Sequence, residues 1–140
     1  TDNHLMVIDV TPLGLTGRQA ESALRDANIT LNRNTVPFDT NGPWYTSGLR
    51  LGTPALTTLG MGKDQMREIA SIINMVLSKT RPRKISTGEN AGSMSKAKYE
   101  IDSAILRKAR AEVKDLLSQF PLYPDLDLPY LQNFLQHLKV

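Results

Sequence analysis

The chain of 140 residues has no cysteine, few aromatic residues and no long apolar run. Without cysteine, neither a disulfide framework nor a thiolate zinc site can form, and the composition is compatible with a reducing cytosol. No apolar stretch approaches the roughly 18 residues that can span a bilayer, and the N-terminus lacks the basic start and apolar core of a secretion signal. We therefore expect a cytoplasmic protein without a membrane span.

Histidine is scarce as well, with only His4 and His137. No pair of histidines or carboxylates has the spacing of a metal site, so no bound metal is expected. We expect His4 to be a buried side chain that hydrogen-bonds neighbouring backbone. The sequence around His137 offers no partner and gives it no role.

The net charge of +3 is unevenly distributed along the chain. Residues 79–110 hold nine basic and three acidic side chains, whereas the segments before and after are slightly acidic. Such a section can attract a polyanion, either nucleic acid or a polyglutamate tail. A solvated loop and helix face is the more common explanation, and Tyr99 alone interrupts the charges, so nucleic acid is not the favoured partner.

Hydrophobic patterning predicts an α+β domain with a small, mostly antiparallel three-stranded sheet covered on one face by helices. Strands are expected over residues 5–10, 29–32 and 49–51, where strand-forming residues are bounded by Pro, Gly or Asn. Thr16 and Gln19 fit a capping box for a helix over residues 17–27. A polar stretch with Pro and Gly, residues 32–48, is expected to be a long ordered loop.

The second half of the chain is predicted to be helical. Apolar residues from Met66 to Leu77 recur at helical spacing, and a second long helix is expected over residues 96–120. We expect the domain to span residues 1–121, with residues 79–95 as a mobile basic connection. Residues 122–140 are expected to form an extension with a short amphipathic helix over residues 128–138.

Arg50 stands out because it lies mid-strand between Leu49 and Leu51 and is bracketed by Gly48 and Gly52. A guanidinium stays charged in proteins and presents a planar fork that matches a carboxylate or phosphate. An arginine held inward on a short strand is suited to binding an anionic substrate group. The alternative is a strand arginine whose head reaches solvent or pairs with a structural aspartate.

Four motifs occur in an order and spacing that resemble the C-terminal domain of serine hydroxymethyltransferases. They are Thr1-Asp2-Asn3-His4, Leu15-Thr16-Gly17, Asn32-Arg33-Asn34 and the stretch from Ser47 to Ala55 around Arg50. The resemblance is continuous from residue 1 to about residue 77, with Arg33 where the family usually has lysine. It implies the small domain of a fold-type I pyridoxal phosphate enzyme, and a homodimer.

The resemblance also implies roles for individual residues. Arg50 aligns with the arginine that binds the substrate α-carboxylate, and Asn34 with the asparagine that hydrogen-bonds the pterin of tetrahydrofolate. The backbone of Asn41, Gly42 and Pro43 aligns with a loop that lines the folate site. The expected reaction converts serine and tetrahydrofolate to glycine and 5,10-methylenetetrahydrofolate.

The family's Schiff-base lysine motif is absent from these 140 residues. We therefore expect the chain to be part of a longer enzyme, with no catalytic residue of its own and no activity without an N-terminal large domain that binds most of the cofactor. Two alternatives stay open: the small domain of another fold-type I pyridoxal phosphate enzyme, and a non-enzymatic module that binds a polyanion through residues 79–110.

Overall fold

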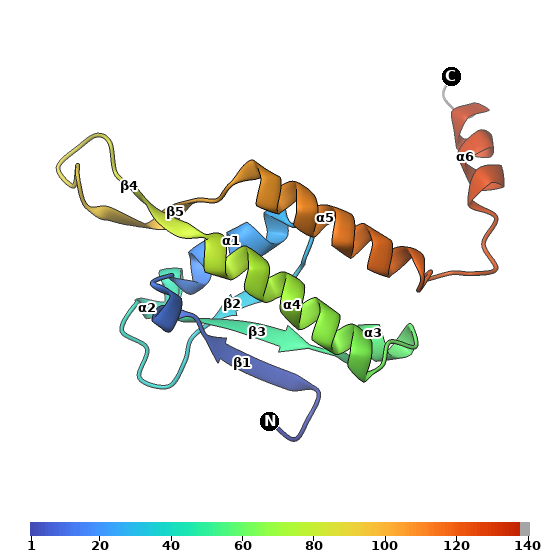
Figure 1. Cartoon of the computed structure of the whole chain (residues 1–140), viewed down its shortest axis with the longest axis horizontal. Coiled ribbons are helices and arrows are strands. Elements are labelled where there is room, and N and C mark those ends of the chain that lie inside the picture. Colours follow the sequence, from blue (N-terminus) through green and yellow to red (C-terminus); the bar gives the residue numbers. More distant parts are fainter. Residues whose placement is uncertain (138–140) are drawn as a thin grey trace.

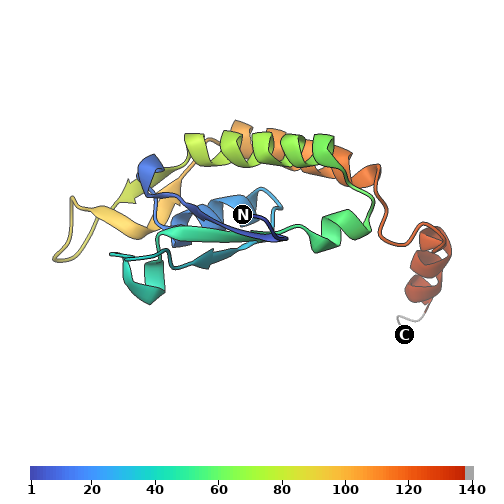
Figure 2. The same cartoon turned by 90° about the horizontal axis from the view of Figure 1, so that it is seen from below.

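Three antiparallel strands and a layer of helices on one side of them form the body of the molecule (Figures 1 and 2). The computed structural model describes residues 1–137. Its elements are β1 (Leu5–Asp9), the 3-10 helix η1 (Thr11–Leu13), α1 (Gly17–Asp26), β2 (Asn32–Asn34), α2 (Gly42–Tyr45), β3 (Gly48–Gly52), α3 (Pro54–Thr58), α4 (Lys63–Lys79), β4 (Arg81–Lys84), β5 (Met94–Glu100), α5 (Ser103–Ser118) and α6 (Leu128–His137). The predicted α+β class and three-stranded sheet are confirmed.

The central strand of this sheet is β3, because the strand order is β1-β3-β2. Both neighbours run antiparallel to it, with Val7 of β1 and Asn32 of β2 on either side of Arg50. Successive side chains of a strand point to opposite faces, so Leu49 and Arg50 lie on different sides of the sheet. Leu49 is 1% exposed and belongs to the core, whereas Arg50 is exposed.

The core lies between the sheet and helices α1, α4 and α5. Small residues of α1 (Ala20 and Ala23) and its C-cap Ala27 let this helix approach closely, and Leu24 is buried beside them. Helices α4 and α5 run side by side above α1 and the sheet (Figure 2). The core residues are Val10, Leu15, Ala20, Ala23, Leu24, Ala27, Leu49, Ile72, Ile73, Val76, Leu77, Ala109 and Val113.

The capping box at the start of α1 is confirmed. The Thr16 hydroxyl accepts a hydrogen bond from the Gln19 backbone N–H at 3.2 Å, and Gln19 Oε1 accepts one from the Thr16 backbone N–H at 2.9 Å. Both side chains are also buried against the β4–β5 hairpin. Gln19 Nε2 donates to the carbonyls of Ser95 and Lys98 at 2.6 and 2.9 Å, and the Thr16 hydroxyl donates to the Lys96 carbonyl at 2.7 Å.

Four of the predicted segments differ from the structure. The second strand is Asn32–Asn34 rather than residues 29–32, because Ile29 and Leu31 pack their side chains against the core before the chain joins the sheet. The expected loop over residues 32–48 therefore begins with β2, and it contains the short helix α2.

The predicted mobile connection over residues 79–95 is wrong in its ends, which form β4 and the start of β5. This antiparallel hairpin projects beyond the body of the molecule (Figure 1). The helix expected from residue 96 begins instead at Ser103, because residues up to Glu100 pair with β4 and Asp102 caps α5 through its side chain. Helix α6 lies apart from the body, and Leu138, at the end of its predicted span, lies outside the described residues.

Candidate functional site

Arg50 presents its guanidinium on the open face of the three-stranded sheet. Its Nε donates a hydrogen bond to Asn32 Oδ1 at 3.1 Å, across the β2–β3 pair. Within the described residues, no carboxylate lies within 4.0 Å of the guanidinium nitrogens, and the other four N–H groups have no hydrogen-bond acceptor. The structure thus places an accessible guanidinium on the central strand of the sheet, exposed to solvent rather than held inward.

A hollow of about 400 Å³ lies beside Arg50 at the Gly52 end of β3. Asn32 and Arg50 are among the polar residues that line it, and Ile69 and Ile73 of α4 contribute apolar wall. His4 also lines the hollow, but its side chain is exposed, so the predicted buried histidine is wrong. Residues 1–9 are all exposed, because β1 is an edge strand that no described element covers on its outer side.

Asn34 lies on the same face of the sheet as Arg50. It is paired with Gly48, two residues before Arg50, and residues two apart on a strand share a face. The Asn34 amide donates to the Thr35 carbonyl at 2.7 Å, while its Oδ1 has no donor among the described residues. The two residues that the resemblance assigns to different substrates therefore lie on one surface.

Asn41, Gly42 and Pro43 belong to a loop that is folded around the Asp39 carboxylate. Asp39 accepts hydrogen bonds from the Ser47 hydroxyl at 2.7 Å, from the backbone N–H groups of Asn41 and Ser47 at 2.8 Å each, and from that of Val36 at 3.2 Å. Partial burial raises the pKa of Asp39, but these hydrogen bonds outweigh it, and the pKa lies below its usual value.

The same loop explains the residue types at positions 41 and 42. The Asn41 amide donates to the Ser47 hydroxyl at 3.0 Å, so this side chain is engaged within the loop. Gly42 has a φ of +67°, a conformation that favours glycine, and Pro43 starts the turn of α2 with its fixed φ. The backbone of this segment and the exposed Pro43 ring remain for contact with a ligand.

The start of β3 is packed against the N-terminus of α1. Thr46 has a φ of +54°, rare for a β-branched residue, and its buried hydroxyl has no hydrogen-bond partner in the described structure. The Gly17 N–H donates to the Thr46 carbonyl at 2.9 Å. A Cβ on Gly17 would lie 2.5 Å from the Gly48 carbonyl oxygen, so only glycine permits this approach.

The side-chain contacts that link α1 to β2 were not predicted from the sequence. Arg33 forms an ion pair with Glu21 at 2.6 Å, and the Arg33 backbone N–H donates to the same carboxylate at 3.3 Å. The guanidinium groups of Arg18 and Arg33 lie 5.0 and 6.0 Å from the centre of the Trp44 ring. These contacts fix β2, and hence Asn32, relative to the body.

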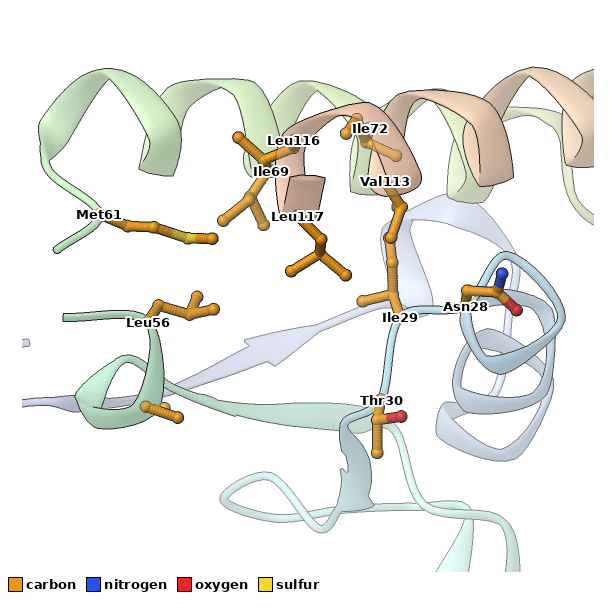
Figure 3. Close-up of a pocket in the computed structure, with 12 residues that line it drawn as sticks. Asn28, Ile29, Thr30, Leu56, Met61, Ile69, Ile72, Val113, Leu116 and Leu117 are labelled. Carbon is orange, nitrogen blue, oxygen red and sulfur yellow. The ribbon is translucent and has the colours of Figure 1, made fainter. Parts of the chain in front are cut away.

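A second hollow is apolar and is unsuited to a charged ligand. It has a volume of about 250 Å³ and lies between α3, α4, the end of α5 and residues 28–30 (Figure 3). The side chains of Leu56, Met61, Ile69 and Leu117 converge on it, and none of the residues that line it is charged.

Residues 79–110 carry their positive charge at the end of α4, on the hairpin and on α5. Two of these basic side chains form hydrogen bonds within the fold. Arg81 donates to the carbonyls of Ser78 and Thr80, and Arg110 donates to the Asp26 carbonyl at 2.6 Å.

The part of the chain that the structure describes contains no group of three potential metal ligands. Nor does any helix in it have the length and apolar character that crossing a membrane requires.

The family model and the individual relatives that match this chain carry the same name. The family model for serine hydroxymethyltransferase matches residues 1–73. Three relatives are named serine hydroxymethyltransferase. This chain is 52% identical to the protein from Treponema pallidum, 55% to that from Salinispora tropica and 54% to that from Chlamydia caviae. The alignments cover 91–94% of this chain but only 22–26% of each relative, so the chain spans about a quarter of the length of these proteins.

Proposed function

The chain belongs to the serine hydroxymethyltransferase family, and from this we propose that it supplies the substrate-carboxylate site and part of the folate site of an enzyme that interconverts serine and glycine. The one-carbon unit passes to tetrahydrofolate. The observation that carries the proposal is the guanidinium of Arg50, which is charged, accessible and held on a central strand without a carboxylate partner among the described residues.

We assign Arg50 to the α-carboxylate of the amino-acid substrate. Two parallel N–H···O bonds between a guanidinium and a carboxylate fix the orientation of the substrate as well as its position. Orientation about the Cα atom determines which bond is aligned for cleavage, so the placement of Arg50 bears on the reaction as well as on affinity.

The residues around Arg50 do not fit the attachment of pyridoxal phosphate. None of the side chains that line the hollow beside Arg50 is a lysine, so no amine for a Schiff base is present there. When bound, this cofactor supplies an electron sink for the substrate carbanion. We assign its binding to the remainder of the enzyme and derive no step through it.

Asn34 is assigned to the folate, since an amide can donate and accept the hydrogen bonds that a pterin offers. Its position on the same face as Arg50 supports the assignment, because the one-carbon unit must pass between two substrates held close together. The backbone of Asn41, Gly42 and Pro43 forms the adjacent edge of this site in our proposal. The homodimer stays a prediction from the resemblance, and the cytoplasmic location stays a prediction from the composition.

The apolar side chains of β1 support the proposal that a larger domain covers this part of the sheet. Leu5, Met6, Val7 and Ile8 are each 38–43% exposed. Contiguous exposed apolar residues of this kind mark an interaction surface. A large N-terminal domain would bury them and close the site over Arg50.

The test uses the complete reading frame that contains this chain, loaded with pyridoxal phosphate. Arg50→Ala should weaken the binding of glycine and serine at least about tenfold, as loss of a charged hydrogen-bond pair predicts. Arg67→Ala is the matched control, because Arg67 is exposed and pairs only with Asp64 on its own helix, at 2.6 Å. Unchanged glycine affinity in Arg50→Ala would refute the assignment.

A further inference from the structure

Asn32 faces Arg50 directly across the β2–β3 pair. We propose that Asn32 is a positioning residue, which holds the Arg50 guanidinium through Nε while leaving its charge and its two terminal nitrogens free for the substrate carboxylate. The inference rests on the proposed role of Arg50 and extends it to a residue that does not itself touch the substrate.

The amide of Asn32 is held in a single orientation. Its Nδ2 donates to the Arg33 carbonyl at 2.9 Å, which turns Oδ1 toward Arg50 Nε, 3.1 Å away. The Arg33 backbone is in turn anchored to α1, because Glu21 binds both its N–H and its guanidinium. A continuous set of contacts therefore runs from α1 through β2 to the guanidinium of Arg50.

The neutrality of this partner matters as much as its position. Arg33 and Arg67 each pair with a carboxylate at 2.6 Å, and that partner compensates their charge. Arg50 is bound by an uncharged amide oxygen instead, so its full charge remains to attract an anion. A carboxylate at position 32 would form an ion pair with Arg50 and compete with the substrate.

The hydrogen bond at Nε also selects the mode of binding. A guanidinium has five N–H donors: one at Nε and two at each terminal nitrogen. With Nε occupied by Asn32, a carboxylate has access to the terminal nitrogens and binds end-on. Arg50 is exposed, so a small ligand can reach the terminal nitrogens from solvent.

The experiment compares Asn32→Ala and Asn32→Asp in the complete, cofactor-loaded protein. We would measure the affinity for glycine and for glycinamide by calorimetry, and KM and kcat for serine. Loss of the amide in Asn32→Ala should weaken glycine binding and raise KM by about tenfold, with a smaller change in kcat. Asn32→Asp should weaken glycine binding further, although it keeps an acceptor for Nε.

Two controls separate positioning from a structural role. Glycinamide lacks the carboxylate, so its affinity should fall in neither variant, whereas a damaged fold would weaken both ligands. Asn74→Asp adds the same charge at an exposed position of α4 that has no hydrogen bond to Arg50, and it should leave glycine binding unchanged.

The possible outcomes discriminate between the two proposals. If Arg50→Ala weakens glycine binding but both Asn32 variants bind glycine as the wild type does, the role of Asn32 is refuted and that of Arg50 stands. If Asn32→Asp binds as tightly as the wild type while Asn32→Ala does not, a neutral partner is not required and the inference is wrong. If Arg50→Ala has no effect, the proposed function itself fails.

Discussion

Gly48 has very little free space around it, although it is the first residue of the strand that carries Arg50. A Cβ at this position would lie 2.7 Å from Val36 Cγ1, 3.0 Å from the Asn34 carbonyl oxygen and 3.1 Å from the Ile8 carbonyl oxygen. Two of these three neighbours are backbone atoms of the adjoining strands, which cannot move aside separately. A side chain here would therefore displace β1 or β2 relative to β3.

We predict that Gly48→Ala destabilises the protein by about 1–3 kcal/mol, the usual cost of overpacking. Gly52→Ala is the matched control at the other end of the same strand. There a Cβ would meet only ordinary contacts at 3.7 Å or more, and the change in stability should stay within about 1 kcal/mol. Urea unfolding of both variants measures the difference, and equal losses would contradict the steric explanation.

The Asp39 carboxylate makes the stability of the protein depend on pH, through the loop before β3. Its pKa is lower in the folded state than in the unfolded chain, so the unfolded chain binds more protons as the pH falls. The stabilisation is present above the ordinary aspartate pKa of about 4 and is lost as the pH falls through the lowered value of the folded state.

We predict that Asp39→Asn lowers the stability at pH 7 and reduces its decline below about pH 4. Urea unfolding at pH 7 and at pH 3 measures both effects. The amide keeps acceptor capacity at one oxygen only, so it cannot reproduce the hydrogen bonds that Asp39 accepts at both. Parallel stability curves for the two proteins would contradict the assignment.

At the level of single residues, the sequence indicated Arg50 as a candidate binding residue but not Asn32, its hydrogen-bond partner. Arg50 was recognised from its place among apolar and glycine neighbours, and its site role stays a prediction. Asn32 was missed, although it lies two residues before Asn34 and alternation places both on one face. Pairing across strands decides which residue faces Arg50, and that register is not readable from one strand alone.

Among the elements, the β4–β5 hairpin is held by contacts distant in the sequence. Its second strand alternates exposed and half-buried residues, but the half-buried ones are Ser95, Ala97 and Tyr99, which do not form the apolar pattern of a strand. Gln19 binds two of its carbonyls. Tyr99 donates to the Asp26 carboxylate, and burial and this bond raise the pKa of Tyr99 above its usual range. Composition and spacing therefore predicted a mobile connection up to residue 95 and a helix from residue 96, where the structure has the hairpin.

We predict that Gln19→Leu destabilises the protein by about 2 kcal/mol or more, because it leaves buried backbone groups without partners. Gln65→Leu is the control, since Gln65 occupies the same capping position in α4 but does not touch the hairpin. Hydrogen exchange should accelerate in β4 and β5 for Gln19→Leu only. Equal protection of the hairpin in both variants would show that Gln19 does not hold it.

For the molecule as a whole, the sequence predicted the fold class because its three strands and two long helices each have a pattern of their own. The arrangement leaves the two faces of the sheet unequal. One face packs on helices and supplies the core, and the other carries Arg50, Asn32 and Asn34 without a covering element in the described structure. The polar face is thus available for ligands, while the apolar edge at β1 is available for another domain.

The strand order has a consequence for the order of folding during synthesis. Because β3 is central, neither β1 nor β2 can pair in this sheet until residues 48–52 have emerged from the ribosome. The apolar face of the new sheet then waits for α4 and α5, which are translated later. During this interval the nascent chain exposes its future core, and chaperone binding or aggregation would compete with folding most strongly there.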